Sequence, residues 1–365
     1  MRAEAFELLR LRIPLKTAFG HAAHTREFSD GYLVLAHDGA GRVGLGEIQA
    51  RTYVTGEDPE QVPELFGALA SPLLGRALDH GDLHHTRAQA DRKLACMSGL
   101  ELSLLDLEAQ AQGVPLGEFL GPLGPELPAG VVIGFEVTTA DLKKHCTLLR
   151  FKGRHHHVKV KVGHPEDRAR LELISQSLGG LPLRLDANGE WTADEALVVL
   201  GGLAGLPIHS VEQPVAAGDL AGMARVRRES GLKVMADESV VTLADAQALI
   251  QAGAVDYLYI RLGKVGGLLG AQALVQAAQA AGVGCLLGTM VGETGVLSAA
   301  TEIFGRRVPG FPCLDGKGQN RHLLEVDPVV PAQDSTGLGL SVEKSLVLQY
   351  GVGSWRYGAP PRGHS

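Results

Sequence analysis

Three acidic residues follow short apolar segments in the second half of the chain, at nearly equal intervals. Asp186 ends the apolar run of "LRLDANGEW", Glu212 that of "SVEQP" and Asp237 that of "MADES", so the intervals are 26 residues (186 to 212) and 25 residues (212 to 237). Three carboxylates held close together repel one another unless a cation lies between them. Oxygen ligands suit Mg²⁺, and less commonly Mn²⁺. We therefore predict a magnesium site built from these residues, although any one of them, taken alone, would more often cap the helix that follows.

Two lysines accompany these carboxylates. In "VKVKVG" (158–163), Lys159 and Lys161 lie one residue apart and share one face of a strand, whereas the valines between them face the other way. A desolvated ammonium beside other cations has a lowered pKa and can act as a base near neutral pH. The combination predicts removal of a proton from a carbon next to a carboxylate, with Mg²⁺ holding the resulting enediolate.

The elements that must position these residues alternate regularly after residue 127. Short apolar segments are followed by helical patterns, in about seven or eight units spaced about 22–28 residues apart. Such a series predicts parallel strands, and so many consecutive units favour a closed barrel over an open sheet. The predicted strands are centred on "AGVVIGFEV", "HVKVKVG", "LPLRLDANG", "PIHSVEQP", "KVMADES", "VDYLYIRLG", "VGCLLGTM" and "PGFPCLD". Catalytic groups in barrels lie at the carboxyl ends of strands, which is where the acidic and basic residues fall.

The rest of the chain predicts a second unit. The first fifty residues have the pattern of antiparallel strands, and residues from about 60 to 122 have a helical pattern. The tail "GLGLSVEKSLVLQYGVGSW" predicts strand and turn that return to the N-terminal unit. We expect an α+β unit of residues 1–125 joined by the tail 320–365, and a barrel of residues 126–319.

Composition limits the classes of function. The chain has 365 residues and a net charge of −7, which provides no basic field for nucleic acid or an anionic membrane. No apolar run reaches the length of a membrane span, and the N-terminus has no signal-peptide pattern. Four widely separated cysteines predict neither a disulfide framework nor a structural zinc site. The expectation is a cytoplasmic protein that acts on a small molecule.

Taken together, the motifs resemble the enolase superfamily, and within it the muconate-lactonizing-enzyme subgroup. "VKVKVG", "LDANGEW", "VEQP" and "ADES" resemble the barrel motifs of that subgroup in order and spacing, and the "TGE" of residues 55–57 resembles its capping domain. The resemblance covers nearly the whole chain. It implies an α+β capping domain on a modified (β/α)7β barrel, one essential Mg²⁺, a small-molecule carboxylate substrate and a homo-oligomer.

The resemblance also implies roles for individual residues. Asp186, Glu212 and Asp237 would be the metal ligands, and Lys161 would be the acid/base group, with Lys159 tuning it. Loops around residues 17–29 and 51–56 would close over the substrate and select it. Candidate substrate-binding residues in these loops are His21, His24, Arg51 and Tyr53. The segment "CLDGKG", with Asp315, resembles the last-strand segment of dipeptide epimerases.

One position departs from the pattern. The subgroup places a second catalytic lysine on the sixth strand, about 24 residues after the third ligand, and position 261 (237 + 24) is Arg261. Lys264 follows three residues later and could take part if the strand is bulged. Because arginine keeps its proton, it is a poor base, although it can hold a carboxylate or an enolate.

Three functions remain open after this substitution. The first is an isomerase, meaning a racemase, epimerase or cycloisomerase of an amino acid derivative or a similar acid. The second is a one-base lyase that resembles o-succinylbenzoate synthase, and the third is a non-catalytic metal-binding relative. The lyase and the non-catalytic relative stay open because Arg261 stands where a second catalytic lysine is expected.

Overall fold

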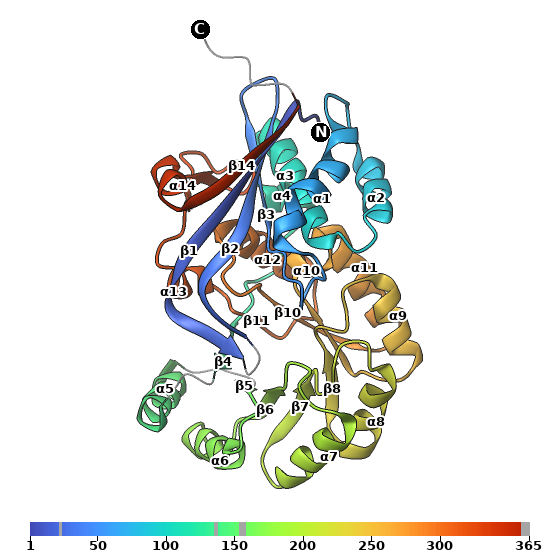
Figure 1. Ribbon diagram of the computed structural model, residues 1–365, viewed down its shortest axis with the longest axis vertical. Helices are drawn as coiled ribbons and strands as arrows, with labels where there is room; N and C mark the ends of the chain where they lie inside the picture. Colours follow the sequence, from blue (N-terminus) through green and yellow to red (C-terminus); the bar gives the residue numbers. More distant parts are fainter. Residues whose placement is uncertain (22–23, 135–137, 153–157, 359–365) are drawn as a thin grey trace.

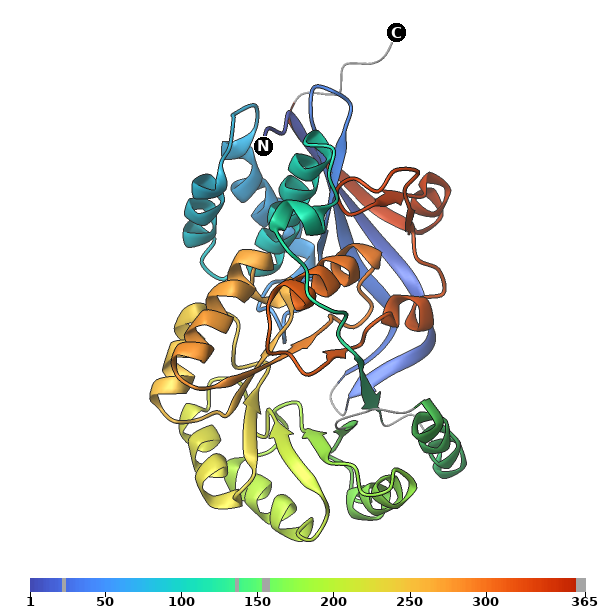
Figure 2. The same ribbon diagram turned by 180° about the vertical axis from the view of Figure 1, so that it is seen from behind.

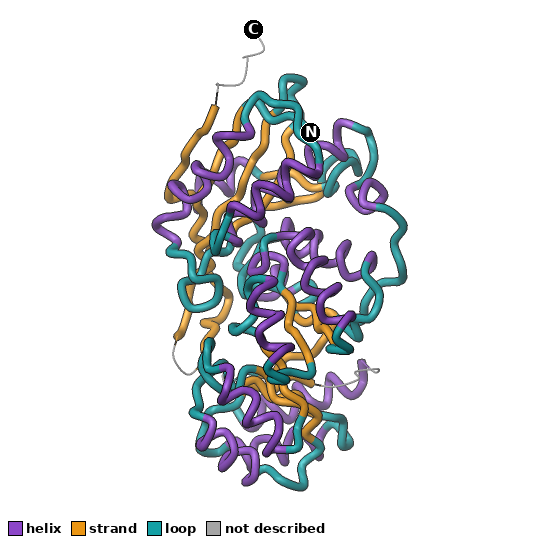
Figure 3. The backbone as a smooth tube through the Cα atoms, turned by 90° about the vertical axis from the view of Figure 1, so that its right-hand side faces the viewer, coloured by secondary structure: helices purple, strands orange, loops and turns teal. Residues whose placement is uncertain are grey.

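The computed structural model describes the whole chain apart from residues 22–23, 135–137, 153–157 and 359–365, and two large groups of strands dominate the described part (Figures 1 and 3). The first is a four-stranded antiparallel sheet in the order β14-β1-β2-β3, which we call the cap sheet. The second is a closed barrel of parallel strands in the order β10-β11-β4-β5-β6-β7-β8-β9. The predicted fold class, a TIM-like barrel with an α+β cap, is confirmed.

The strands and helices of the cap come from both ends of the chain. The strands are β1 (Ala5–His21), β2 (His24–His37), β3 (Val43–Ile48) and β14 (Gly351–Gly358). The helices are α1 (Val62–Ala70), α2 (His80–Gln89), α3 (Leu94–Ala111), α4 (Leu116–Leu120) and α14 (Lys344–Tyr350), with 3-10 turns at Pro59–Gln61 and Ser71–Leu73. Figure 2 shows the segment after α4 running from the cap to the barrel, where it enters β4.

Close packing of α3 explains two glycines in β3. Gly44 and Gly46 point to the same face of the strand, and a Cβ on either would collide with the backbone carbonyl of Ser103 or Gly99 in α3. The helix can therefore lie directly on the sheet, and it is buried along almost its whole length.

The tail differs partly from its prediction. As predicted, it returns to the cap, because β14 pairs with β1 from Ala5↔Gly358 onward. The predicted strand and turn are interrupted by the helix α14, whose first turn is capped by the Glu343 side chain accepting from the backbone N–H of Ser345. A two-stranded sheet of β12 (Val329–Pro331) and β13 (Leu340–Val342) precedes this helix. We keep the division of the chain near residues 125 and 320 as a proposal that this pairing supports.

The barrel repeats a short strand and a covering helix. Its strands are β4 (Ala129–Ile133), β5 (Val158–Lys161), β6 (Leu183–Asp186), β7 (Ile208–Glu212), β8 (Lys233–Ala236), β9 (Tyr257–Ile260), β10 (Gly284–Gly288) and β11 (Leu314–Asp315). Its helices are α5 (Thr139–Lys152), α6 (Asp167–Ser177), α7 (Ala193–Gly202), α8 (Leu220–Ser230), α9 (Leu243–Gln251), α10 (Leu262–Val265), α11 (Gly267–Ala280), α12 (Gly295–Arg307) and α13 (Gln319–Leu323). The capping box of Thr192 and Glu195, expected from "TADE", is present at the start of α7.

Within the described part of the chain, no helix combines the length and apolar character needed to cross a bilayer.

Strand register brings the sequence-predicted residues together. Lys161 at the end of β5 lies beside Asp186 at the end of β6, and Asp186 lies beside Glu212 at the end of β7. Val158 and Val160 of β5 are fully buried and alternate with the lysines, as predicted from the period of two. The carboxyl ends of three neighbouring strands therefore present one lysine and two carboxylates at the same level.

Buried glutamates join the cap to the barrel. Glu47 of β3 accepts from the backbone N–H groups of Thr294 (2.8 Å) and Leu297 (3.1 Å), and so caps the amino end of α12. Glu101 of α3 accepts in the same way from Leu268 (2.6 Å) and Leu269 (3.1 Å), in the first turn of α11. The two domains thus share helix-capping interactions that neither could complete alone.

We expect the Glu101→Gln variant to be more stable than the wild type above pH 7. Burial raises the pKa of Glu101 to about 7, although the two amides oppose this shift. The folded chain thus holds this proton more tightly than the unfolded chain, so its stabilising contribution is complete below pH ~4.5 and is lost as the pH rises through about 7. The loss amounts to about 3 kcal/mol at most. Urea unfolding at several pH values measures it, with Glu118→Gln on α4 as an exposed control. Equal pH slopes for the wild type and Glu101→Gln would contradict the assignment.

Candidate active site

Lys159 bridges two of the three predicted metal ligands. Its Nζ lies 2.9 Å from Asp186 Oδ2 and 2.6 Å from Glu212 Oε1, and all three side chains are buried. The same Nζ lies 4.6 Å from the centroid of the Tyr259 ring. Although burial lowers the pKa of Lys159, the two carboxylates raise it above its ordinary value. Lys159 is thus the ion-pair partner of both carboxylates in this structure.

Asp237, the third predicted ligand, is held by Arg261 and Lys264. Arg261 donates from Nη2 to Asp237 Oδ2, and Lys264 Nζ lies 2.7 Å from Asp237 Oδ1. Lys264 also donates to the carbonyl oxygens of Asp237 (2.5 Å) and Tyr259 (3.1 Å), and it is fully buried. Burial raises the pKa of Asp237, but the two cations outweigh this effect and lower it to about 2.

The path of the backbone corrects the prediction for this strand. The sequence analysis centres the sixth strand on "VDYLYIRLG" (255–263) and allows Lys264 to take part if that strand is bulged. Instead β9 ends at Ile260, Arg261 precedes α10, and Lys264 lies within that one-turn helix. The helical turn brings Lys264 back over the end of the strand, so both cations reach Asp237 although they are three residues apart.

Lys161 reaches a different partner, which the sequence analysis did not single out. Its Nζ donates to Asn188 Oδ1 (3.2 Å), and Asn188 Nδ2 donates to Glu238 Oε1 (3.2 Å). Asn188 has a φ of 47°, in the left-handed region that asparagine tolerates better than most residues. The Asn-Gly pair directly after the strand in "LDANG" was the available signal. This amide orients the Lys161 ammonium without neutralising it.

The interior of the barrel contains a buried arginine that sequence reasoning also missed. Arg184 of β6 donates from Nη2 to Asp315 Oδ2, and its Nε lies 3.6 Å from Glu212 Oε2. Tyr259 donates its hydroxyl to the same Asp315 oxygen at 3.0 Å. In "LRLD" an arginine has the pattern of a solvent-facing residue. The role of Asp315 in substrate binding stays a prediction, since the structure places its carboxylate against Arg184 and Tyr259.

The predicted cap residues are described only in part. The side chains of His21 and His24 lie outside the described part of the structure, so their predicted role is not tested. Arg51 is buried (5% exposed) and Tyr53 is 39% exposed.

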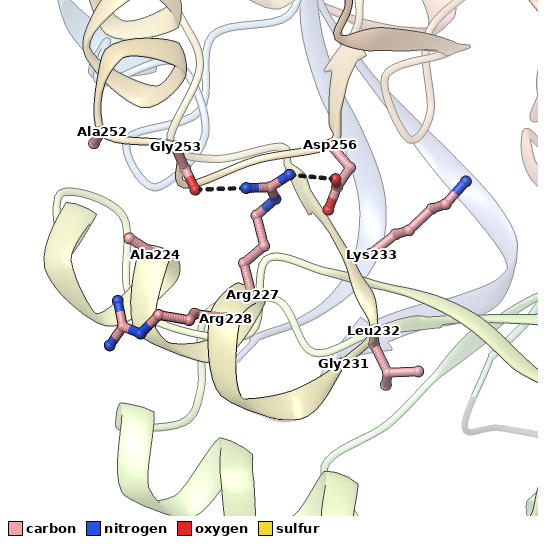
Figure 4. A pocket seen from close by; sticks show the side chains of 9 residues that line it. All are labelled: Ala224, Arg227, Arg228, Gly231, Leu232, Lys233, Ala252, Gly253 and Asp256. Carbon is pink, nitrogen blue, oxygen red and sulfur yellow. Dashed lines mark hydrogen bonds and ion pairs between the residues drawn. The ribbon is translucent and has the colours of Figure 1, made fainter.

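A hollow of about 540 Å³ lies at the other end of the barrel. It is lined by α8, the end of α9 and the start of β8, and within it Arg227 donates to Asp256 Oδ1 (2.8 Å) and the Gly253 carbonyl (3.1 Å) (Figure 4). Lys233 begins β8 here, whereas Asp237 follows the opposite end of the same strand. This hollow is therefore separate from the predicted site.

The three carboxylates suit a divalent cation by their chemistry. Among the described residues, no three acidic, histidine or cysteine side chains form a group placed to hold a metal, and cationic side chains pair with the carboxylates instead. Glu212 Oε2, however, is buried and accepts no hydrogen bond from any described residue. Hard oxygen donors, including this buried oxygen, whose ion-pair contact with Arg184 is 3.6 Å long, fit Mg²⁺.

Known proteins are similar to this chain in sequence and in fold. A family model described as enolase C-terminal domain-like matches residues 141–345. The L-Ala-D/L-Glu epimerase of Bacillus subtilis (strain 168) is 32% identical over 314 residues, which is 82% of this chain and 84% of that protein. A chloromuconate cycloisomerase of Cupriavidus pinatubonensis is 29% identical over 96% of this chain and 99% of that protein.

A solved structure extends this likeness to the whole fold. A dipeptide epimerase from Enterococcus faecalis V583, crystallised with Mg and the dipeptide L-Leu-L-Tyr, superposes with a TM-score of 0.82 at 27% identity, covering 93% of this chain and 100% of that one. The chain therefore belongs to the enolase C-terminal domain-like family, in the mandelate racemase and muconate lactonizing enzyme subgroup of the enolase superfamily.

Proposed function

We propose that this protein is a Mg²⁺-dependent isomerase that removes and returns the α-proton of a small carboxylate, as a racemase, epimerase or cycloisomerase. One observation carries the proposal. Strand register places Lys161 beside Asp186 and Asp186 beside Glu212 at one end of the barrel, and Lys264 reaches the same end through Asp237. Similarity to two isomerases along most of the chain supports it.

Asp186, Glu212 and Asp237 would hold the metal ion. When bound, the ion supplies positive charge to the substrate carboxylate and makes its α-proton more acidic. Lys159, Arg261 and Lys264 already show that these carboxylates attract cations in a buried setting. Lys159 stays close by as a second positive charge, which stabilises the negative charge that develops on the carboxylate.

Lys161 is the proposed base on one face of the substrate. The Asn188 amide holds its ammonium at the carboxyl end of β5 without contributing a negative charge. Lys159, by contrast, is paired with Asp186 and Glu212, whose charges stabilise its protonated form. In an epimerisation, Lys161 as the neutral amine would take the α-proton from one face, and a group on the opposite face would deliver a proton to the α-carbon.

Lys264 is the proposed group on the opposite face, since Arg261 cannot give up its proton readily. Burial lowers the pKa of Lys264, while Asp237 opposes the shift. Arg261 then serves as the counter-ion that keeps Asp237 charged. A one-base lyase is the second candidate, and it is favoured by the same substitution if Lys264 stays bound to Asp237 throughout the reaction.

Deuterium exchange at the α-carbon distinguishes these functions. Dipeptides, N-acyl amino acids and succinylbenzoate precursors would be incubated with Mg²⁺ in D₂O, starting from each antipode. For an isomerase, we expect exchange from both antipodes with inversion. Exchange with retention, or loss of water, would support the lyase. Absence of exchange with any of these acids, in the wild type and in Arg261→Lys alike, would refute the enzymatic proposal.

The Lys264→Met variant should lose exchange from one antipode selectively. We expect a fall of about 10²-fold or more for that antipode, because a missing acid/base group costs roughly that much. Arg261→Lys keeps a positive charge beside the Asp237 carboxylate. Its exchange rate should stay within about tenfold of the wild-type rate for both antipodes. Equal losses for both antipodes in Lys264→Met would show that Lys264 is structural.

A further inference from the structure

Gln213 is a buried glutamine whose main chain adopts a conformation that glutamine rarely has. It follows Glu212 directly at the end of β7, it is fully buried, and its φ is 40°. A positive φ is uncommon for residues other than glycine, and asparagine and aspartate tolerate it better than glutamine. A glutamine keeps such a conformation only where the surrounding structure imposes it.

The turn of the main chain at Gln213 redirects one carbonyl group. The Gln213 N–H donates to the Met235 carbonyl of β8 (2.8 Å), as in a regular parallel pair. In such a pair, the Gln213 carbonyl would accept from the N–H of Asp237. It accepts instead from the N–H of Gly189 (2.7 Å), in the segment that follows β6. The main chain of this one residue therefore holds the ends of both neighbouring strands.

The Gln213 side chain takes the place of that carbonyl toward β8. Its Oε1 accepts from the N–H groups of Asp237 (3.1 Å) and Ser239 (3.0 Å). Its Nε2 donates to the Ser239 hydroxyl oxygen (2.7 Å) and to the Val215 carbonyl (2.8 Å). A side-chain amide has two N–H donors and two acceptor lone pairs, so these four contacts use its whole hydrogen-bonding capacity. A buried polar group that is completely satisfied makes its surroundings rigid.

These contacts join the three strand ends that carry the predicted metal ligands. Glu212 precedes Gln213 in the chain, and Asp237 is held through its N–H. The contact with Gly189 reaches the segment after β6, whose last residue is Asp186. Because the pairing of β7 with β8 ends before Asp237, the position of Asp237 relative to Glu212 depends on the Gln213 side chain.

We propose that Gln213 is a positioning residue that fixes the spacing of Asp186, Glu212 and Asp237, so that one metal ion can contact all three. The inference rests on the proposed function, in which these carboxylates hold Mg²⁺. The four contacts of the Gln213 amide leave no donor or acceptor for the metal ion or the substrate. Gln213 therefore acts through the main chain that carries the ligands.

Two substitutions at position 213 test the proposal. Gln213→Asn introduces a residue that tolerates a positive φ, as Asn188 does at 47°, but its amide is one methylene too short to make the same four contacts. Gln213→Gly adopts a positive φ without strain and removes the amide altogether. Isothermal titration with MgCl₂ should show affinities reduced by about tenfold or more in both variants, as expected when a partner that orients metal ligands is lost.

A glutamine of the cap provides the matched control. Gln110 of α3 donates to the Val43 carbonyl (2.9 Å) and to Asp106 Oδ2 (3.0 Å), so Gln110→Asn breaks comparable contacts outside the barrel. Its Mg²⁺ affinity should stay within about twofold of the wild type, because distant sites act independently. Affinities of both Gln213 variants within about threefold of the wild type, or an equal loss in Gln110→Asn, would overturn the proposal.

Melting temperatures measured without Mg²⁺ show whether the variants fold. If neither Gln213 variant folds, Ser239→Ala decides, because it removes the hydroxyl that accepts from Gln213 Nε2 and keeps the Ser239 N–H. Its Mg²⁺ affinity should fall by about threefold or more, as expected for the loss of one buried hydrogen bond. An affinity equal to that of the wild type would then overturn the positioning role.

The same titrations separate this proposal from the proposed function, because they need no substrate. If no acid exchanges its α-proton but the Gln213 variants bind Mg²⁺ more weakly than the wild type, the positioning role stands and the enzymatic proposal fails. If exchange occurs and the Gln213 variants keep the wild-type affinity for Mg²⁺, the enzymatic proposal stands and the positioning role fails. A wild type that binds no Mg²⁺ would overturn both.

Discussion

Replacing Lys161 with methionine is expected to reduce α-proton exchange by about 10³-fold, because a positioned general base contributes roughly 10²–10⁴-fold. Methionine keeps the length and apolar stem of the lysine, so β5 and its register with Asp186 should persist. What is lost is the amine that Asn188 holds at the carboxyl end of the barrel. Proton NMR of the substrate in D₂O measures the loss directly.

The controls for Lys161→Met separate chemistry from folding. Lys143→Met removes an exposed lysine of α5 that is not among the predicted site residues, and this variant should exchange at the wild-type rate. Exchange should fall most steeply for the antipode that Lys264→Met leaves intact, because the two lysines act on opposite faces. Exchange by Lys161→Met within tenfold of the wild type for both antipodes would mean that another group removes the proton.

Changing Asp186 to asparagine is expected to weaken Mg²⁺ binding by about 100-fold or more, since even changes to residues that merely support a metal ligand cost 10–100-fold. Asparagine preserves the shape of the side chain and one carbonyl oxygen, but it removes the negative charge. Isothermal titration with MgCl₂ measures the affinity, and activity should fall in parallel. The pairing of Asp186 with Lys159 at 2.9 Å is also weakened, which leaves Glu212 as the remaining acidic partner of that lysine.

A matched surface variant tests the specificity of this effect. Asp194→Asn, in the exposed first turn of α7, should bind Mg²⁺ as the wild type does. The metal should also raise the melting temperature of the wild type, because a ligand that binds only the folded state stabilises it. If Asp186→Asn keeps its Mg²⁺ affinity and its thermal response to Mg²⁺, the ligand assignment is wrong.

The sequence alone was sufficient to predict side-chain direction wherever that direction follows from the repeat of a strand or of a strand-helix unit. Lys159 and Lys161 alternate with valines in β5, and the acidic residues recur once per strand and helix, so their meeting at one end of a parallel barrel follows from regular geometry. The motifs also pointed to the family, which the comparisons confirm. Arg261 was noticed for the same reason, because the regular spacing of the motifs places a second lysine at position 261 and the sequence has an arginine there.

Tertiary structure alone decided which charges pair. Lys264 reaches Asp237 because α10 turns the chain back within one helical turn, and a period of two along a strand gives no sign of that turn. Arg184 meets Asp315 across 131 residues, and Arg10 meets Asp30 on the neighbouring strand across 20 residues. Side-chain direction along a strand is set by neighbouring residues, whereas the partner of a buried charge is set by segments that only the closed barrel and its cap bring together.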